Sequence, residues 1–87
     1  MLPACRIECF TRSQDGAIAG FAGSDGEGRP WSFSSAALIR AIVKGDMTCY
    51  VTFEGHAHLV TVQADAAGTH SLMTILGELE TLLPVCR

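Results

Sequence analysis

Long apolar runs and clustered positive charge are both missing from this chain. No segment approaches the roughly 18 consecutive apolar residues that mark a membrane span. The start, Met1 to Arg6, has neither a basic stretch nor a long apolar core, so it lacks the pattern of a secretion signal. These absences predict a soluble cytoplasmic protein without a membrane partner.

Basic residues are scarce and scattered. Six of them stand against nine acidic residues, which gives a net charge of −3. They are Arg6, Arg12, Arg29, Arg40, Lys44 and Arg87. A groove for nucleic-acid phosphates needs basic residues gathered in a patch or stripe, so we do not expect direct nucleic-acid binding.

Neither a C-x-x-C pair nor a nucleotide-binding motif occurs. The four cysteines are Cys5, Cys9, Cys49 and Cys86. In a cytoplasmic chain they are expected to be reduced, mostly buried thiols rather than a disulfide scaffold. The loop at residues 23–30 has no phosphate-binding glycine pattern, and its acids Asp25 and Glu27 would repel phosphate.

The composition fits one small globular domain over residues 1–87, with 48% hydrophobic and 17% charged residues. Its clearest element is a helix within the segment from Trp31 to Gly45. Ser34 can cap the first turn, Gly45 suits the left-handed residue that ends a helix, and Lys44 lies near the negative end of the dipole. The wide apolar stripe predicts that this helix is buried on more than one side.

Strand patterns precede the helix. Residues 4–11 alternate between apolar and polar, which predicts a half-buried strand. Its phase places Cys5 and Cys9 on the inward face and Phe10 on the outward face. A turn signal and a second short strand at 17–22 follow, so a hairpin is predicted.

The segment 47–64 has the clearest strand alternation. Gly55-His56 fits a two-residue turn with glycine first. Folding the chain there predicts these pairs: Phe53 with His58, Val51 with Val60, Cys49 with Val62, and Met47 with Ala64. One face of this hairpin is almost wholly apolar, and a slip of one residue would bring Thr61 and Gln63 into the core.

The end of the chain fits two structures. Apolar residues at helical spacing from Leu72 to Leu83 predict an amphipathic helix ended by Pro84, but residues 69–75 fit a strand equally well. The predicted fold class is α+β: an antiparallel sheet of four to five strands with one principal helix packed on one face. The predicted order is β-β-α-β-β, followed by a short strand, a short C-terminal helix or both.

A series of short motifs runs through nearly the whole chain. They are R-I-E-C-F, A-I-A-G-F-A-G, W-S-F-S, I-R-A-I-V-K-G, C-Y-V-T-F-E-G, L-V-T-V-Q-A, H-S-L-M-T and a leucine-rich end before P-V-C. In this order they resemble a family of small bacterial domains of unknown function. The resemblance implies no activity and favours a strand for His70 to Thr74. The chain departs from the family pattern between Thr74 and Leu82, which leaves a short helix over Leu76 to Leu83 open.

No convergent catalytic set is present in the sequence, so the leading hypothesis is a non-catalytic interaction module without a cofactor. A small chain this rich in apolar residues has apolar surface left for a partner. We expect a protein partner or a second copy of the chain to bind a sheet face or edge. The predicted surface lies on the outer face of the central hairpin: Tyr50, Thr52, Leu59 and Thr61.

Two other functions stay open. The first is a small acidic inhibitor, of the phage or anti-CRISPR type, that fills the basic groove of a nucleic-acid-handling complex. It requires acidic residues to cluster on one surface: Asp25, Glu27, Asp46 and Glu54. The second is a metal- or thiol-dependent activity, since imidazoles bind zinc and an activated thiol is a nucleophile. Its candidate residues are His56, His58, His70 and Cys86.

Overall fold

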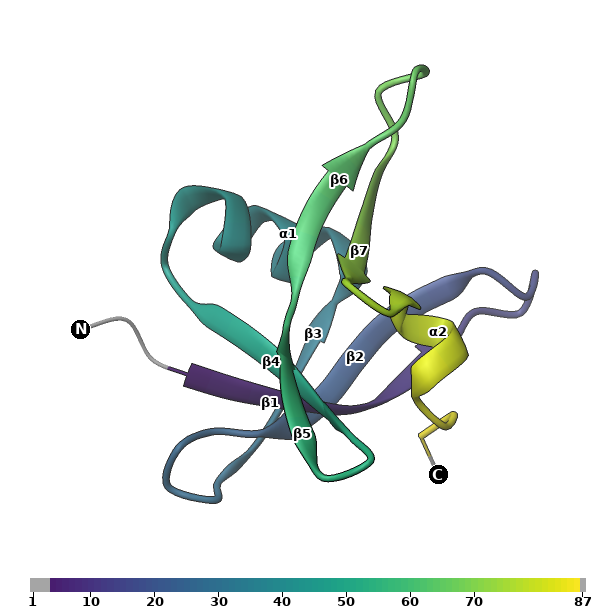
Figure 1. Ribbon diagram of the computed structural model, residues 1–87. Coiled ribbons are helices and arrows are strands. Elements are labelled where there is room, and N and C mark those ends of the chain that lie inside the picture. Colours follow the sequence, from purple (N-terminus) through teal and green to yellow (C-terminus); the bar gives the residue numbers. More distant parts are fainter. Residues whose placement is uncertain (1–3, 87) are drawn as a thin grey trace.

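The computed structural model describes residues 4–86 (Figure 1). In chain order the elements are β1 (Ala4–Arg12), β2 (Ile18–Ser24), β3 (Pro30–Ser34), α1 (Ser35–Lys44), β4 (Thr48–Phe53), β5 (His56–Leu59), β6 (Thr61–Ala64), β7 (His70–Thr74), β8 (Gly77–Glu78) and α2 (Leu79–Leu82). The strands form a five-stranded sheet in the order β3-β2-β1-β4-β5 and a three-stranded sheet in the order β6-β7-β8. The fold is α+β, as predicted. The larger sheet is mixed rather than antiparallel, because β1 and β4 run parallel.

Helix α1 begins and ends where the sequence predicts. The Ser34 hydroxyl accepts a hydrogen bond from the Ala37 N–H at 3.2 Å. Gly45 ends the helix in the left-handed region at φ 80°, and its N–H bonds back to the last turn. Neither helix in the described part of the chain is long and apolar enough to cross a membrane.

The residues just before α1 form an additional strand that the predicted order lacks. In β3, Trp31 pairs with Gly23 and Phe33 pairs with Phe21 of β2. Gly20 makes the close approach possible, because a Cβ atom there would lie 2.5 Å from the Phe33 carbonyl oxygen. The aromatic residues at the helix entrance therefore belong to the sheet.

A β-bulge in β1 inverts the predicted alternation. Ile7 pairs with Gly23 but Cys9 pairs with Ala22, so one extra residue lies between the two pairs on β1. Beyond the bulge, Phe10 is buried at 3% exposure and Cys9 is partly exposed. The prediction that Cys9 points inward and Phe10 outward is wrong for this reason.

The C-terminal segment lies against the second half of β1. The Phe10 N–H donates to the Pro84 carbonyl at 3.1 Å, and the Cys86 N–H donates to the Phe10 carbonyl at 2.8 Å. A disulfide joins Cys9 to Cys86. The expectation of reduced thiols is wrong for this pair, because the bulge takes Cys9 off the buried face of β1 and places it beside the C-terminal segment.

The hairpin of β4 and β5 turns one residue earlier than predicted. Phe53 pairs with His56, so Glu54-Gly55 is the turn rather than Gly55-His56. Both turn residues have positive φ, 52° for Glu54 and 82° for Gly55. This is the backbone of a type I′ turn, whose twist matches that of the two strands.

The register of this hairpin differs from the prediction by two residues. Val51 pairs with His58 rather than with Val60. A shift of two residues keeps every side chain on its predicted face, so Cys49 and Val51 are fully buried. The prediction of which β4 residues face inward is therefore confirmed, whereas the predicted pairing partners of β4 are wrong.

The predicted pairs of Cys49 with Val62 and of Met47 with Ala64 are also wrong. The chain leaves β4 at Val60 and continues directly into β6 (Figure 1). There it pairs with β7 of the smaller sheet, from Thr61 opposite Met73 to Ala64 opposite His70. Residues His70 to Thr74 are thus a strand, and the helical leucines are confined to α2.

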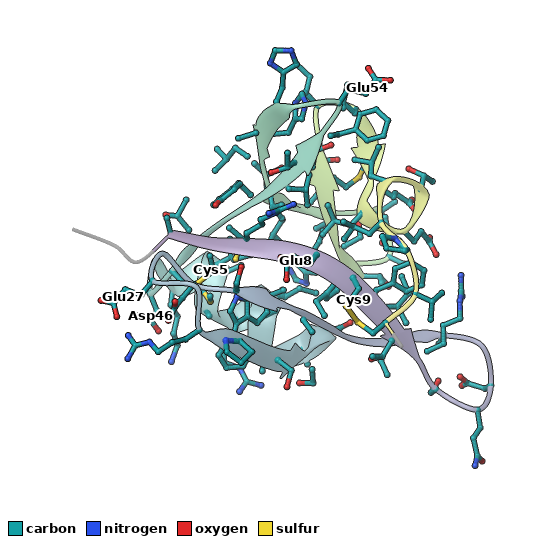
Figure 2. All side chains as sticks on the ribbon, turned by 90° about the horizontal axis from the view of Figure 1, so that it is seen from below. Cys5, Glu8, Cys9, Glu27, Asp46 and Glu54 are labelled. Atoms are coloured by element: carbon teal, nitrogen blue, oxygen red, sulfur yellow. A yellow bond between two sulfur atoms is a disulfide. The ribbon has the colours of Figure 1, made fainter. Side chains whose placement is uncertain are left out.

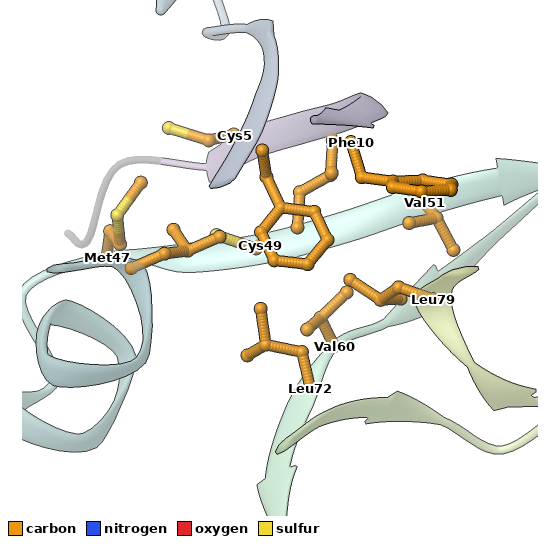
Figure 3. Packing of buried hydrophobic residues seen from close by; sticks show 11 residues of the cluster. Cys5, Phe10, Met47, Cys49, Val51, Val60, Leu72 and Leu79 are labelled. Atoms are coloured by element: carbon orange, nitrogen blue, oxygen red, sulfur yellow. The ribbon is translucent and has the colours of Figure 1, made fainter. Parts of the chain in front are cut away.

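The core is one cluster of buried side chains contributed by both sheets and both helices (Figure 3). Its members are Cys5, Ile7, Phe10, Phe21, Leu38, Met47, Cys49, Val51, Val60, Leu72 and Leu79. Helix α1 contributes Leu38 and lies near strands of both sheets. The opposite face of β4 and β5 carries Tyr50 and Leu59, and Leu59 is open to solvent at 60% exposure.

Candidate docking surface

Strand β5 has a free edge. It pairs with β4 on one side and is the last strand of its sheet among residues 4–86. The Val60 N–H donates to the Cys49 carbonyl at 3.0 Å, so Val60 directs its backbone groups toward β4. Successive residues of a strand direct these groups to opposite sides. Ala57 and Leu59 therefore point their N–H and C=O groups away from β4, into solvent.

A groove of about 440 Å³ runs along this edge. It is lined by Ala57, His58, Leu59, Thr61, Gln63, Thr74 and Ile75. None of these residues is an aspartate, glutamate, lysine or arginine. Ile75 is 90% exposed and Leu59 is 60% exposed, so two large aliphatic side chains lie open to water beside one groove. Adjacent exposed apolar side chains of this kind are typical of an interaction surface.

The turn between β7 and β8 holds Ile75 outward. Thr74 is buried, and its hydroxyl accepts a hydrogen bond from the Leu76 N–H at 3.0 Å. The same hydroxyl donates to the Gly77 carbonyl at 3.3 Å. These bonds brace the turn around Ile75, so the exposed position of its side chain is built into the fold.

The four residues of the predicted interaction surface fall into two groups. Tyr50 lies directly opposite Leu59, and Thr52 lies opposite Ala57, on the outer face of β4 and β5. Thr61 lies beyond the bend, in the smaller sheet, where its hydroxyl donates to the Met73 carbonyl at 3.4 Å. Leu59 and Thr61 both line the groove.

The sequence patterns identify Leu59 and Thr61 as surface residues but miss the other five that line the groove: Ala57, His58, Gln63, Thr74 and Ile75. The predicted register pairs Ala57 with Glu54 beside the turn, whereas the observed register pairs it with Thr52 at the free edge. Ile75 stands in a T-I-L-G stretch that fitted both a strand and a helix. Gly77 is the turn signal in this stretch, and nothing in the sequence signals that Ile75 is exposed.

The four predicted acidic residues do not all gather on one surface, because Glu54 lies apart from the others. Asp25 and Glu27 lie in the turn between β2 and β3, where Arg29 forms ion pairs with both, at 3.2 Å and 2.9 Å. Glu54 lies in the β4–β5 turn, at a different end of the molecule from Glu27 and Asp46 (Figure 2). The hydrogen bond from the Arg29 N–H, followed by that from Glu27, lowers the pKa of Asp25. Its carboxylate therefore has a structural role in the turn.

The histidines and Cys86 do not converge either. His56 and His58 lie in β5, whereas His70 begins β7. Between residues 4 and 86, no group of three or more histidine, cysteine, aspartate or glutamate side chains is placed to hold a metal ion. Cys86 is bonded to Cys9 and is not a free thiol.

The two free cysteines are poorly suited to nucleophilic chemistry. Cys5 and Cys49 are buried, at 6% and 0% exposure, and face each other across β1 and β4. Burial, with a smaller contribution from Cys5, raises the pKa of the Cys49 thiol to about 12. A thiol with this pKa is protonated near neutral pH, and the reactive species is the thiolate.

A second, smaller pocket of about 210 Å³ lies between α1, β7 and α2. Its lining combines apolar and polar side chains: Ile18, Phe21, Ser35, Ile39, His70, Ser71, Leu72, Glu78, Leu79 and Glu80. A hydrogen bond with Glu80, together with its charge, raises the pKa of Glu78. Arg12 lies 3.8 Å from Glu80, so part of this acidic charge already has a partner within the molecule.

No family model, curated protein or solved structure matches the chain. The resemblance to the uncharacterised bacterial domains stays a prediction, and it carries no activity. Function is therefore inferred from the groove and from the free edge of β5.

Proposed function

We propose that this protein is a non-catalytic interaction module that binds an extended, uncharged protein segment along the edge of β5. The observation that carries the proposal is the free backbone of Ala57 and Leu59 beside a groove without charged side chains. An added strand bonds to such an edge through its main chain, and the side-chain groove selects the sequence. No cofactor is needed for this role.

The expected contact is weak and reversible. Full burial of Leu59 or Ile75 contributes about 1 to 3 kcal/mol each. Each main-chain hydrogen bond adds on the order of 1 kcal/mol. Association itself costs roughly 4 to 15 kcal/mol in lost freedom of motion. An edge this short therefore supports a transient contact, or a stable one when a larger partner covers the outer face as well.

The partner is a protein rather than a nucleic acid, because the groove offers no basic side chain to phosphate. The cytoplasmic location expected from the sequence remains a prediction. The Cys9–Cys86 disulfide favours an oxidising compartment instead, since cytosolic thiols are kept reduced.

A peptide titration tests the docking of a strand. Isotope-labelled protein at low concentration is titrated with the capped peptide T-V-T-V-T, which is extended and uncharged, and amide shifts are followed by NMR. We expect shifts concentrated at Ala57, Leu59 and Ile75. Leu59→Glu should abolish these shifts, because it introduces a charge at the groove.

Val43→Glu is the matched control, since Val43 is exposed to a similar degree, 64%, but lies on α1 away from the groove. It should bind the peptide as the unmodified protein does. The proposal is overturned if no shifts occur at millimolar peptide, or if Leu59→Glu leaves them unchanged.

A further inference from the structure

We infer that the strand bound at this edge is β5 of a second copy of the chain, paired antiparallel about a two-fold axis at His58. This inference rests on the proposed function and names its partner. It comes from the self-complementarity of the free edge, which has three parts: backbone groups, side-chain size and charge.

The free backbone groups of two copies match in one register. Ala57 of one copy lies opposite Leu59 of the other, and each of these two pairs exchanges two main-chain hydrogen bonds. A shift that places Leu59 opposite itself would put Ala57 opposite Thr61, whose backbone is committed to Met73 of β7. The opposite shift would bring the Gly55 turn into the pairing. The register about His58 uses every free group of the edge.

The side chains fit the same register. Ala57 and Leu59 both lie on the outer face, because they stand opposite Thr52 and Tyr50. Two-fold pairing sets the large Leu59 side chain against the small Ala57 of the other copy. The contact then continues onto Tyr50, which lies beside Leu59. Cross-strand pairs of this kind are the stabilising unit of a sheet.

Charge permits two identical edges to meet. Identical strands repel when they carry charge near the axis, and the groove along β5 carries no aspartate, glutamate, lysine or arginine. The edge carries no lysine, proline or bulge, and its short length of four residues is the one feature that limits self-pairing. By contrast β3, at the other edge of the same sheet, begins with Pro30, which cannot donate a hydrogen bond. A pocket of about 270 Å³ is lined in part by Ser32, Phe33 and Ser34 of β3, so Pro30, and not the presence of a hollow, distinguishes the two edges.

A cysteine trap tests the register. In the proposed dimer, His58 faces its own counterpart in a non-hydrogen-bonded pair with a Cα separation of about 4.5 Å, which a disulfide can bridge. We expect His58→Cys to form a covalent dimer under mild oxidation on a non-reducing gel. Ala57→Cys should not, because it meets its counterpart on a diagonal of about 7 Å. Val43→Cys on α1 is the control that measures disulfide formation through random collisions between molecules. The buried Cys5 and Cys49 do not compete in this assay.

Light scattering on the unmodified protein provides a second readout that does not depend on the cysteine variants. The mass should rise toward the dimer with concentration, and Leu59→Glu should hold it at the monomer. Equal trapping of all three cysteine variants, or a monomer at millimolar concentration, overturns the dimer. If the T-V-T-V-T peptide still binds at β5 in that case, the proposed function stands without the dimer. If neither dimer nor peptide binding is seen, both are rejected.

Discussion

Leu59 and Ile75 line one groove although they come from different sheets, Leu59 from the end of β5 and Ile75 from the turn after β7. The bend at Val60 brings them together, because there the chain passes from the larger sheet into the smaller one. Neither side chain contributes to the buried core. Their shared position is therefore available for binding without cost to the fold.

The first prediction is that a substitution at Ile75 changes binding without changing the stability of the fold. Ile75→Glu should weaken peptide binding at least tenfold, because it places a charge in the apolar groove. The free energy of unfolding should change by less than about 0.5 kcal/mol, as for most surface substitutions. Urea titration followed by circular dichroism checks stability, with Val43→Glu as the control. A large loss of stability in Ile75→Glu would show that the side chain has a structural role.

The type I′ turn predicts a stabilising substitution. Glu54 has φ 52°, a conformation that glycine, asparagine and aspartate adopt more readily than glutamate. Glu54→Asn creates the Asn-Gly sequence that this turn prefers, and should raise the free energy of unfolding by about 0.5 to 1 kcal/mol. Glu54→Val should lower it, because a β-branched residue is strained at positive φ. Equal stability of the two variants would contradict the observed turn.

Reduction of the Cys9–Cys86 bond should lower stability substantially. The bond closes a loop across a sequence separation of 77, and chain entropy assigns such a loop about 4.5 kcal/mol. Urea unfolding with and without dithiothreitol measures the difference, and the Cys9→Ser/Cys86→Ser double variant should match the reduced protein. An unchanged midpoint after verified reduction would mean that the C-terminal segment contributes nothing through this bond.

The buried thiols should be inert in the folded protein. Cys5 and Cys49 lie in the core, and the pKa of Cys49 is raised to about 12. A thiol reagent at pH 8 should label neither residue in native, non-reduced protein and should label both in urea. Rapid labelling of the folded protein would contradict their burial. Mass spectrometry after alkylation identifies the labelled positions.

Two carboxylates should titrate in opposite directions from their ordinary values. Hydrogen bonds from Arg29 and Glu27 lower the pKa of Asp25, so its stabilising effect is present above the unfolded pKa and is lost as pH falls through the folded value. Glu78 should titrate above its ordinary value because of Glu80, and Glu80→Gln should bring the midpoint down. NMR titration of the carboxyl carbons measures both. Identical midpoints for Glu78 in the variant and the parent would contradict this pairing.

Local signals in the sequence were sufficient for the bounds of α1. The prediction that the helix is buried on more than one side is wrong, because only Leu38 is buried and Val43 is 64% exposed. Ser34 and Gly45 act on the backbone within a few residues, so the cap and the end of the helix follow from the residue types. The inward face of β4 was also predictable, because alternation determines faces without reference to partners. The α+β class follows from these two elements.

Partners across the sheet were not predictable in the same way. The bulge in β1 depends on how β2 packs beside it, and it reverses the faces of Cys9 and Phe10. Gly55 fits a turn as its first or its second residue, and the choice rests on whether Glu54 accepts a positive φ. The bend at Val60 lies where the chain stops pairing with β4 and starts pairing with β7, and this change of partner depends on residues distant in the sequence.

The residues of the candidate surface also divide into those that local sequence patterns predict and those that depend on tertiary structure. Leu59 was identified because its outward face follows from alternation along the hairpin. Ile75 was not, since its exposure depends on the turn that Thr74 braces. The groove exists because of that turn, so its full lining could not be inferred from the sequence.

Amide hydrogen exchange at Ala57 and Leu59 tests the central claim, that the edge of β5 is a docking site for a strand, most directly. Exchange is measured by NMR in dilute protein, in concentrated protein and in dilute protein with the T-V-T-V-T peptide. Both amides should exchange rapidly in the dilute sample and be protected at least tenfold when a second copy or the peptide occupies the edge. Protection already present in the dilute monomer, or absent under all three conditions, would contradict the claim.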